Sequence, residues 1–339
     1  MITLDGSMGE GGGQVLRTAL SLSLVTGQPF VIERIRAGRN KPGLARQHLT
    51  CVLAAAEVGD ARVEGAELGS QRLAFKPKCV RAGDYTFAIG TAGSTTLVLQ
   101  TLLPALLSAD KASTLTVTGG THNPMCPPFD FLAKCFAPAL RAMGLSMDLQ
   151  LLRHGFAPAG GGAIACTINP GKPRPIEFLQ REAVGLPRAR VLVSKLPRDV
   201  GEREVHVVRR RLDLHAQQVL VENVDSHGPG NMVLLEFPNR FVTEVIGVPG
   251  ERGVRAEQVA EQACAQAKRY LATDAPVGEH LADQLLLPMA MAGGGAFRTL
   301  EPTLHARTNA EVVERFLPVK FAMKDDGAGA WTVSVQSAS

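Results

Sequence analysis

A glycine-rich stretch near the N-terminus, residues 9–13, leads directly into an apolar segment with helical spacing, residues 15–24. Glycines before a helix let a phosphate group approach the backbone N–H groups of its first turn. The stretch is followed by no Lys-Ser/Thr pair, and Gln14 stands where a dinucleotide-binding fingerprint needs glycine. The sequence therefore predicts a phosphate-binding loop that is neither a P-loop nor a dinucleotide fingerprint.

Glu10 lies inside this loop. A carboxylate there would repel a phosphate group unless a cation lay between the two, which favours a metal site. A carboxylate at a helix start also stabilises the helix dipole without any ligand. The sequence leaves both interpretations open.

Basic residues gather in two places, although the net charge is only +4. Arg36, Arg39 and Lys41 lie in a turn rich in Gly and Pro, where binding groups often collect. That turn is predicted to face a phosphate-rich partner. The run at residues 209–211 ends a polar segment and is interpreted as a solvated helix face.

His305 is the histidine best placed for chemistry, because it lies in the predicted turn at residues 304–309. Neutral imidazole is available near pH 7 as a nucleophile. A lone histidine is more often structural, so spacing alone leaves its role open.

The elements that must position these residues recur along the chain. Residues 90–94 lead into a second apolar helix as residues 9–13 lead into the first, and each helix is followed by a strand, a turn, another helix and further strands. A third pair of predicted helices lies near the C-terminus. Polar markers separated by 26, 29 and 26 residues relate the three units: Gln14 and Asn40, Ser94 and Asn123, Asp283 and Asn309.

The third unit is interrupted. A strand-like segment ends near residue 178, but the next apolar helix begins only about residue 278. The excess has its own alternating strand and helix pattern, long enough for a small domain. We therefore predict a main domain, residues 1–180 and 275–339, and an inserted α/β module, residues 181–274, whose removal should leave the main domain folded.

Composition agrees with an α/β protein of this size. With 339 residues, 45% of them hydrophobic, the chain can bury a large core. No apolar run reaches the ~18 residues that would span a bilayer, and the first residues are typical of a strand rather than a signal peptide, so we expect a cytoplasmic protein without a membrane partner. The six cysteines show no CxxC spacing and are interpreted as reduced structural thiols. The sequence assigns no oligomeric state.

Several long motifs follow one another in a fixed order: GEGGGQVLRTALSLS, RAGRNKPGLARQHL, AELGSQRL, LLRHGFAPAGGG, HLADQLLLPMA and TNAEVVERFLPVKF. Together they closely resemble the RNA 3′-terminal phosphate cyclase family. The resemblance implies a large domain of three repeated two-helix, four-strand units. It also implies that the insert is similar to the C-terminal domain of translation initiation factor 3.

The resemblance further implies an activity. Members of the family use ATP to convert an RNA 3′-phosphate into a 2′,3′-cyclic phosphodiester, through a covalent histidine–AMP and an RNA-adenylate, releasing AMP and pyrophosphate. His305 matches the adenylylated histidine. The implied cofactors are ATP and a divalent metal, Mg²⁺ or Mn²⁺, with Glu10 as the metal-binding carboxylate. The implied partner is RNA with a 3′-phosphate end.

Further site residues follow from the same resemblance. Residues implied to contact the nucleotide are Gln100, Pro127, His280, Leu281, Ala282, Asp283 and Gln284. The chain departs from the family at His280, where an aromatic residue usually stacks on adenine against the proline matching Pro127. Candidate contacts to phosphate or RNA are Arg17, Arg36, Arg39, Gln47 and His48.

Two other classes of function remain to be weighed. A non-catalytic relative with this fold would act as an RNA-processing assembly factor, but such relatives lack the nucleophilic histidine that His305 matches. Enolpyruvyl transferases also stack repeated helix–sheet units, and would bind a small phosphorylated substrate without a nucleotide. None of their motifs is evident here.

Overall fold

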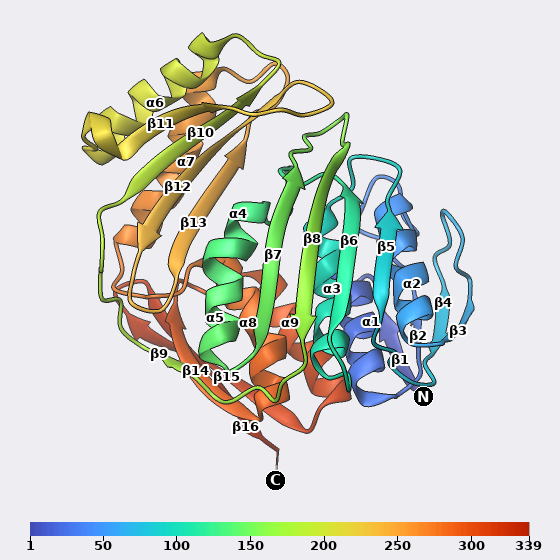
Figure 1. Ribbon diagram of the computed structural model, residues 1–339. Coiled ribbons are helices and arrows are strands. Elements are labelled where there is room, and N and C mark those ends of the chain that lie inside the picture. The colour runs from blue at the N-terminus through green and yellow to red at the C-terminus, as the bar shows by residue number, and fades with distance from the viewer. Residues whose placement is uncertain (339) are drawn as a thin grey trace.

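The computed structural model describes residues 1–338 as a mixed α/β protein, which confirms the predicted fold class. Within these residues the strands form four four-stranded sheets. Three of the sheets surround a set of helices, and the fourth lies beside them with two helices of its own (Figure 1).

The first unit contains two helices and one sheet. Its elements are β1 (Ile2–Asp5), α1 (Gln14–Thr26), β2 (Phe30–Glu33), α2 (Arg46–Val58), β3 (Arg62–Glu64) and β4 (Leu73–Lys76). The apolar run predicted as a helix is thus α1, and Gly27 ends it in the left-handed conformation that glycine adopts without strain.

The second unit repeats this order with a broken second helix. Its elements are β5 (Asp84–Ala88), α3 (Thr95–Leu107), β6 (Ser113–Gly119), α4 (Phe129–Phe131), the π-helical turn η1 (Leu132–Phe136), α5 (Ala137–Ala142), β7 (Ser146–Arg153) and β8 (Gly162–Asn169). Ser94 caps α3, since its hydroxyl accepts a hydrogen bond from the backbone N–H of Leu97.

The third unit is split by about a hundred residues. Its elements are β9 (Glu177–Phe178), α8 (Glu279–Ala292), β14 (Gly294–Thr299), α9 (Leu304–Phe316), β15 (Val319–Gly327) and β16 (Ala330–Ser337). All three sheets place the first strand of the unit beside the second, then the fourth, then the third. In each, the first two strands are parallel and the other pairs antiparallel.

The intervening segment forms the fourth sheet. Its elements are β10 (Arg188–Ser194), α6 (Arg198–Leu212), the 3-10 turn η2 (Ala216–Gln218), β11 (Val219–Asn223), β12 (Gly230–Pro238), β13 (Thr243–Pro249) and α7 (Ala256–Leu271). Their strand order, β11-β10-β12-β13, differs from that of the other three sheets. Figure 1 shows α6 and α7 on the outer face of this sheet.

The main hydrophobic core includes residues of the three units and of the fourth sheet. Helix α1 packs against α2, α3 and α9, and α8 packs against α9, so one hydrophobic cluster runs through all three units. The outer face of the fourth sheet packs with α6 and α7 into a separate cluster. The inner face belongs to the main cluster, through Leu192, Met232, Leu234 and Val245.

The prediction that His305 lies in a turn is wrong. Thr303 caps α9, because its hydroxyl accepts a hydrogen bond from the backbone N–H of Ala306, and His305 therefore lies in the first helical turn. Asn309 is also helical, whereas Asn40 and Asn123 precede their helices. The similar spacings of 26, 29 and 26 residues therefore do not mark equivalent positions for these asparagines. Within residues 1–338, no helix is both long enough and apolar enough to cross a membrane.

Candidate active site

A cavity of about 940 Å³ lies where α1, α3, α8 and α9 meet β13 and α7 of the fourth sheet. It brings together most of the residues singled out in the sequence. Those lining it are Glu10, Arg17, Arg36, Arg39, Gln47, His48, Gln100, Pro127, His280, Asp283, Gln284 and His305.

Leu281 and Ala282 do not line this cavity. Their side chains are 0% and 2% exposed and belong to the hydrophobic cluster. Only part of the surface of α8 faces the cavity, so consecutive residues of one motif point in different directions. The side chains of these two residues pack α8 in place rather than facing a ligand.

His305 is held by a chain of hydrogen bonds that reaches from α9 to α8 through α1. Its Nδ1 lies 2.7 Å from Gln14 Oε1, and Gln14 Nε2 donates to Asp283 Oδ1 at 2.7 Å. Asn309 Nδ2 also donates to Asp283 Oδ1, at 3.0 Å. Burial raises the pKa of Asp283, against the opposing effects of His305 and these hydrogen bonds.

This chain selects one tautomer of His305. The amide nitrogen of Gln14 is committed to Asp283, so its oxygen faces the ring and can only accept a hydrogen bond. Nδ1 must therefore carry a proton. In the neutral ring the lone pair is then on Nε2, which makes Nε2 the nucleophilic atom.

The carboxyl group of Glu10 contacts Nε2 of His305. Its Oε2 is 2.8 Å from His305 Nε2 and 3.6 Å from the guanidinium of Arg39. Within residues 1–338, no group of three His, Cys, Asp or Glu side chains could hold a metal ion. A single carboxylate still suits Mg²⁺, which is often held by one or two carboxylates together with substrate phosphates. Glu10, 40% exposed, fits that requirement.

The part of the cavity around Gly12 and Gly13 is cationic and tightly packed. A Cβ atom at Gly13 would lie 2.1 Å from His48 Nε2, so only glycine leaves room for that ring. Arg17 lies close to the same position, and Arg36 is fixed by its bonds to the carbonyl groups of Lys41 and Gly43. These guanidinium groups form a site for an anion.

His48 is neutral in this environment. Burial, then the charges of Arg17, Arg36 and Arg39, lower the pKa of His48 from 6.5 to about 3. Its Nδ1 is buried without a hydrogen-bond partner among the described residues. Gln47 next to it accepts a hydrogen bond from the backbone N–H of Ser94 at 2.7 Å, which ties α2 to the start of α3.

The lowered pKa of His48 predicts sensitivity to acid. The unfolded chain binds a proton at this residue near pH 6.5 and the folded protein only near pH 3, so stability is fully present above pH 6.5 and is lost as the pH falls towards 3. We expect His48→Gln to flatten the fall in melting temperature between pH 6.5 and 4. His206→Gln, an exposed control on α6, should not; an unchanged slope for His48→Gln would contradict the assignment.

Most of the residues implied to bind the nucleotide lie on α3, on α8 and in the segment before α4. Gln100 on α3 donates a hydrogen bond to Gln284 on α8, so the two side chains bridge the helices. The carbonyl of Pro127 accepts a hydrogen bond from Thr96 at 2.8 Å. The imidazole of His280 is 62% exposed at the cavity and lies 3.8 Å from Glu279.

Sequence reasoning missed the role of Gln14, which it treated as a departure from a glycine fingerprint and as a marker of the repeated units. Asn309 and Thr18 were also missed, although Thr18 donates to Asn309 at 2.8 Å and completes the support of Asp283. One local signal was available. Gln14 and Thr18 are four residues apart, so they lie on one face of the largely apolar α1.

Two comparisons with known proteins agree with this geometry. A family model described as RNA 3′-terminal phosphate cyclase matches residues 8–323. A protein described as RNA 3′-terminal phosphate cyclase from Koribacter versatilis (strain Ellin345) is 53% identical over 328 residues, covering 96% of this chain and 92% of the relative. The chain therefore belongs to the RNA 3′-terminal phosphate cyclase family of enzymes.

Proposed function

We propose that this protein uses ATP to convert the 3′-terminal phosphate of an RNA into a 2′,3′-cyclic phosphodiester through AMP bound covalently to His305. The observation that carries the proposal is the fixed tautomer of His305, whose Nδ1 faces Gln14 while Nε2 faces the cavity. The family membership supports the same activity.

In the first step His305 Nε2 attacks the α-phosphorus of ATP. A P–N bond forms, the bond to the bridging oxygen breaks, and pyrophosphate leaves. The attack needs the Nε2 lone pair, so a proton held between Nε2 and Glu10 must first pass to solvent, and Glu10 must move away from the ring as a carboxylate. The hydrogen bond from Nδ1 to Gln14 holds the ring in place meanwhile, which helps to keep the attacking atom aligned.

Glu10, once free, is the residue that would hold a divalent ion, Mg²⁺ or Mn²⁺, together with the phosphates of the nucleotide. Such an ion, when bound, would neutralise the negative charge of those phosphates. This accounts for a carboxylate close to Arg39 in a cavity that Arg17 and Arg36 also line.

In the second step an oxygen of the RNA 3′-phosphate attacks the same phosphorus, and the P–N bond breaks. The bonding electrons return to Nε2, so the ring, which still carries its Nδ1 proton, leaves as neutral imidazole, and the product is an RNA-adenylate. We place the 3′-phosphate at Arg17, Arg36 and Arg39, with Gln47 and His48 beside it, because an anion there is paired with guanidinium groups.

In the third step the neighbouring 2′-OH attacks the phosphorus of the former 3′-phosphate. The new P–O bond closes the ring, AMP leaves, and the hydroxyl loses its proton. The fixed closeness of the 2′-OH replaces a bimolecular encounter, an effect that contributes several kcal/mol in well-oriented reactions.

The direct test is incubation of the protein with α-labelled ATP and Mg²⁺, followed by recovery of the protein. We expect acid-labile, base-stable label on the protein, and its transfer when an RNA with a 3′-phosphate is added. A protein that takes no label, or an RNA with a 3′-hydroxyl that discharges the label equally well, would overturn the proposal.

Gln14→Leu tests the role of the fixed tautomer. The leucine side chain has a similar size but cannot accept the Nδ1–H bond, so both tautomers of His305 become available. We expect the rate of labelling at saturating ATP to fall about 100-fold, the range seen when proton positioning is lost. The matched control is Gln28→Leu, which removes a glutamine bonded to the carbonyl of Phe316 outside the cavity. Equal rates for both variants would exclude the tautomer mechanism.

A further inference from the structure

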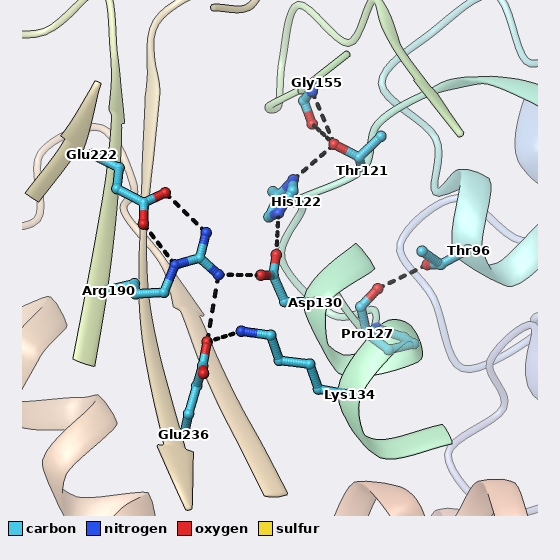
Figure 2. A network of polar contacts seen from close by, with 10 residues as sticks. All are labelled: Thr96, Thr121, His122, Pro127, Asp130, Lys134, Gly155, Arg190, Glu222 and Glu236. Atoms are coloured by element: carbon cyan, nitrogen blue, oxygen red, sulfur yellow. Dashed lines mark hydrogen bonds and ion pairs between the residues drawn. The ribbon is translucent and has the colours of Figure 1, made fainter. Parts of the chain in front are cut away.

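The fourth sheet contacts the rest of the protein through several polar groups, and two of these contacts lie next to residues that line the cavity. The first centres on Arg190 of β10. Its guanidinium donates to Asp130 Oδ1 of α4 at 2.6 Å and forms a two-point pair with Glu222 at 2.7 and 2.9 Å (Figure 2). Lys134 of η1 pairs with Glu236 of β12 next to it, so charges from both sides alternate across the contact.

Asp130 is also fixed from within the second unit. Its Oδ2 lies 2.9 Å from His122 Nε2, and His122 Nδ1 lies 2.7 Å from the hydroxyl of Thr121. Burial alone would raise the pKa of Asp130, but the bonds and charges of His122 and Arg190 outweigh it and lower that pKa. Asp130 is thus an ionised carboxylate shared by two elements.

This contact leads directly to one wall of the cavity. Asp130 is the second residue of α4, which begins immediately after Pro127 and Pro128. Pro127 is further tied by its carbonyl to Thr96 of α3 (Figure 2). The position of Pro127 therefore depends on α3 from one side and, through α4, on Arg190 of the fourth sheet from the other.

The second contact leads to the facing wall. Glu244 of β13 is 3% exposed, and its Oε2 accepts a hydrogen bond from the backbone N–H of Gly278 at 3.2 Å. Gly278 is the N-cap of α8, two residues before His280. A Cβ atom at Gly278 would lie 2.2 Å from Glu244 Oε1, so the carboxyl group closes directly over the start of this helix.

The fourth sheet also contributes to the cavity itself. Residues Val245, Gly247, Val248, Pro249 and Glu251 line it from β13 and the following turn, and Gln262 and Gln266 line it from α7. The last two are four residues apart and therefore share one helical face. The cavity is bounded on this side by the fourth sheet and α7.

We propose that the segment of residues 181–274 is a structural part of the nucleotide site, in which Arg190 and Glu244 act as positioning residues that set the separation of Pro127 and His280 around the adenine base. The proposal rests on the proposed function, because it assumes that these two residues bind ATP. The link is mechanical: β10 and β13 belong to one sheet, in which both pair with β12, and this sheet holds the starts of α4 and α8 together.

Loss of either contact should affect the base and not the phosphates. The base would stack between walls that are no longer held at one spacing, and stacking is worth on the order of 1–3 kcal/mol per base. Binding to the base is equal in the ground and transition states, so its loss raises KM without lowering kcat. The residues around His305 have their own support through Gln14 and Asp283.

The experiment compares Glu244→Ala with Glu244→Gln in the full-length chain. The alanine cannot accept the bond from Gly278, whereas the amide oxygen of glutamine can. For Glu244→Ala we expect the KM for ATP in the labelling reaction to rise about tenfold, with kcat at saturating ATP within about twofold of wild type. Glu244→Gln should restore the KM. The inhibition constant of tripolyphosphate, which carries no base, should not change.

Glu261→Ala is the surface control, because Glu261 pairs only with the exposed Arg211. If Glu244→Ala does not fold, Arg190→Lys, which keeps the charge but loses the two-point pair, takes its place. A normal KM for ATP, or a parallel loss of ATP and tripolyphosphate binding, would overturn the positioning role while wild-type labelling stands. A wild type that takes no label would instead overturn the proposed function.

Discussion

Replacing His305 with asparagine should give a folded protein that accepts no AMP from ATP and cyclises no 3′-phosphate RNA. Asparagine can keep a hydrogen bond to Gln14 but offers no basic nitrogen to attack phosphorus. Because His305 is 40% exposed at the end of a capped helix, its loss should leave the melting temperature within a few degrees of wild type. Protein-bound label and cyclic-phosphate product, measured together, check the expectation.

The matched control is His206→Asn, which changes an exposed histidine on α6 far from the cavity lining. It should label at the wild-type rate. Normal labelling of His305→Asn would show that another residue carries AMP.

Replacing residues 181–274 with a short Gly/Ser linker should abolish soluble expression. The inner face of the fourth sheet places Leu192, Met232 and Leu234 in the main cluster, and the side chains they cover would become exposed. Each large apolar side chain contributes about 1.5–3 kcal/mol when buried, against a total stability of about 5–15 kcal/mol. Asp130 and Lys134 would also lose their partners. Size-exclusion chromatography of the refolded protein would report aggregates.

The control is the same linker inserted into the exposed turn at residues 251–255, which leaves the sheet in place. It should yield a monodisperse protein with a normal melting temperature. A well-folded truncated protein would restore the expectation from the sequence that the module can be removed.

The sequence anticipated the elements well because their signals are local. Each apolar run with helical spacing became a helix, and the insert, predicted to contain strands and helices of its own, contains β10 to β13 with α6 and α7. The turn assigned to His305 was wrong because one hydroxyl, that of Thr303, moved the helix start towards the N-terminus. Leu281 and Ala282 were assigned with their motif as a block, whereas burial is decided residue by residue around a helix.

The site itself was anticipated only in part, because its geometry depends on distant pairs. Gln14 and Asp283 are 269 residues apart. No local pattern could therefore show that Asp283 fixes the amide group of Gln14, which in turn orients His305. The role of Arg190 depends in the same way on a partner 60 residues away, Asp130. Contacts of this kind follow from topology, which periodicity does not encode.

The split of the third unit has a consequence for biosynthesis. The ribosome releases β9 about a hundred residues before its parallel partner β14, and the contact between Gln14 and His305 spans 291 positions. Contacts of such long range form late in folding, because closing the long loop between the two residues costs conformational entropy before the contact stabilises the fold. Nascent chains can complete the first two sheets and then the fourth, but His305 has not yet met Gln14. Under the proposed mechanism, the protein therefore gains the capacity to react with ATP only when nearly the whole chain has been made.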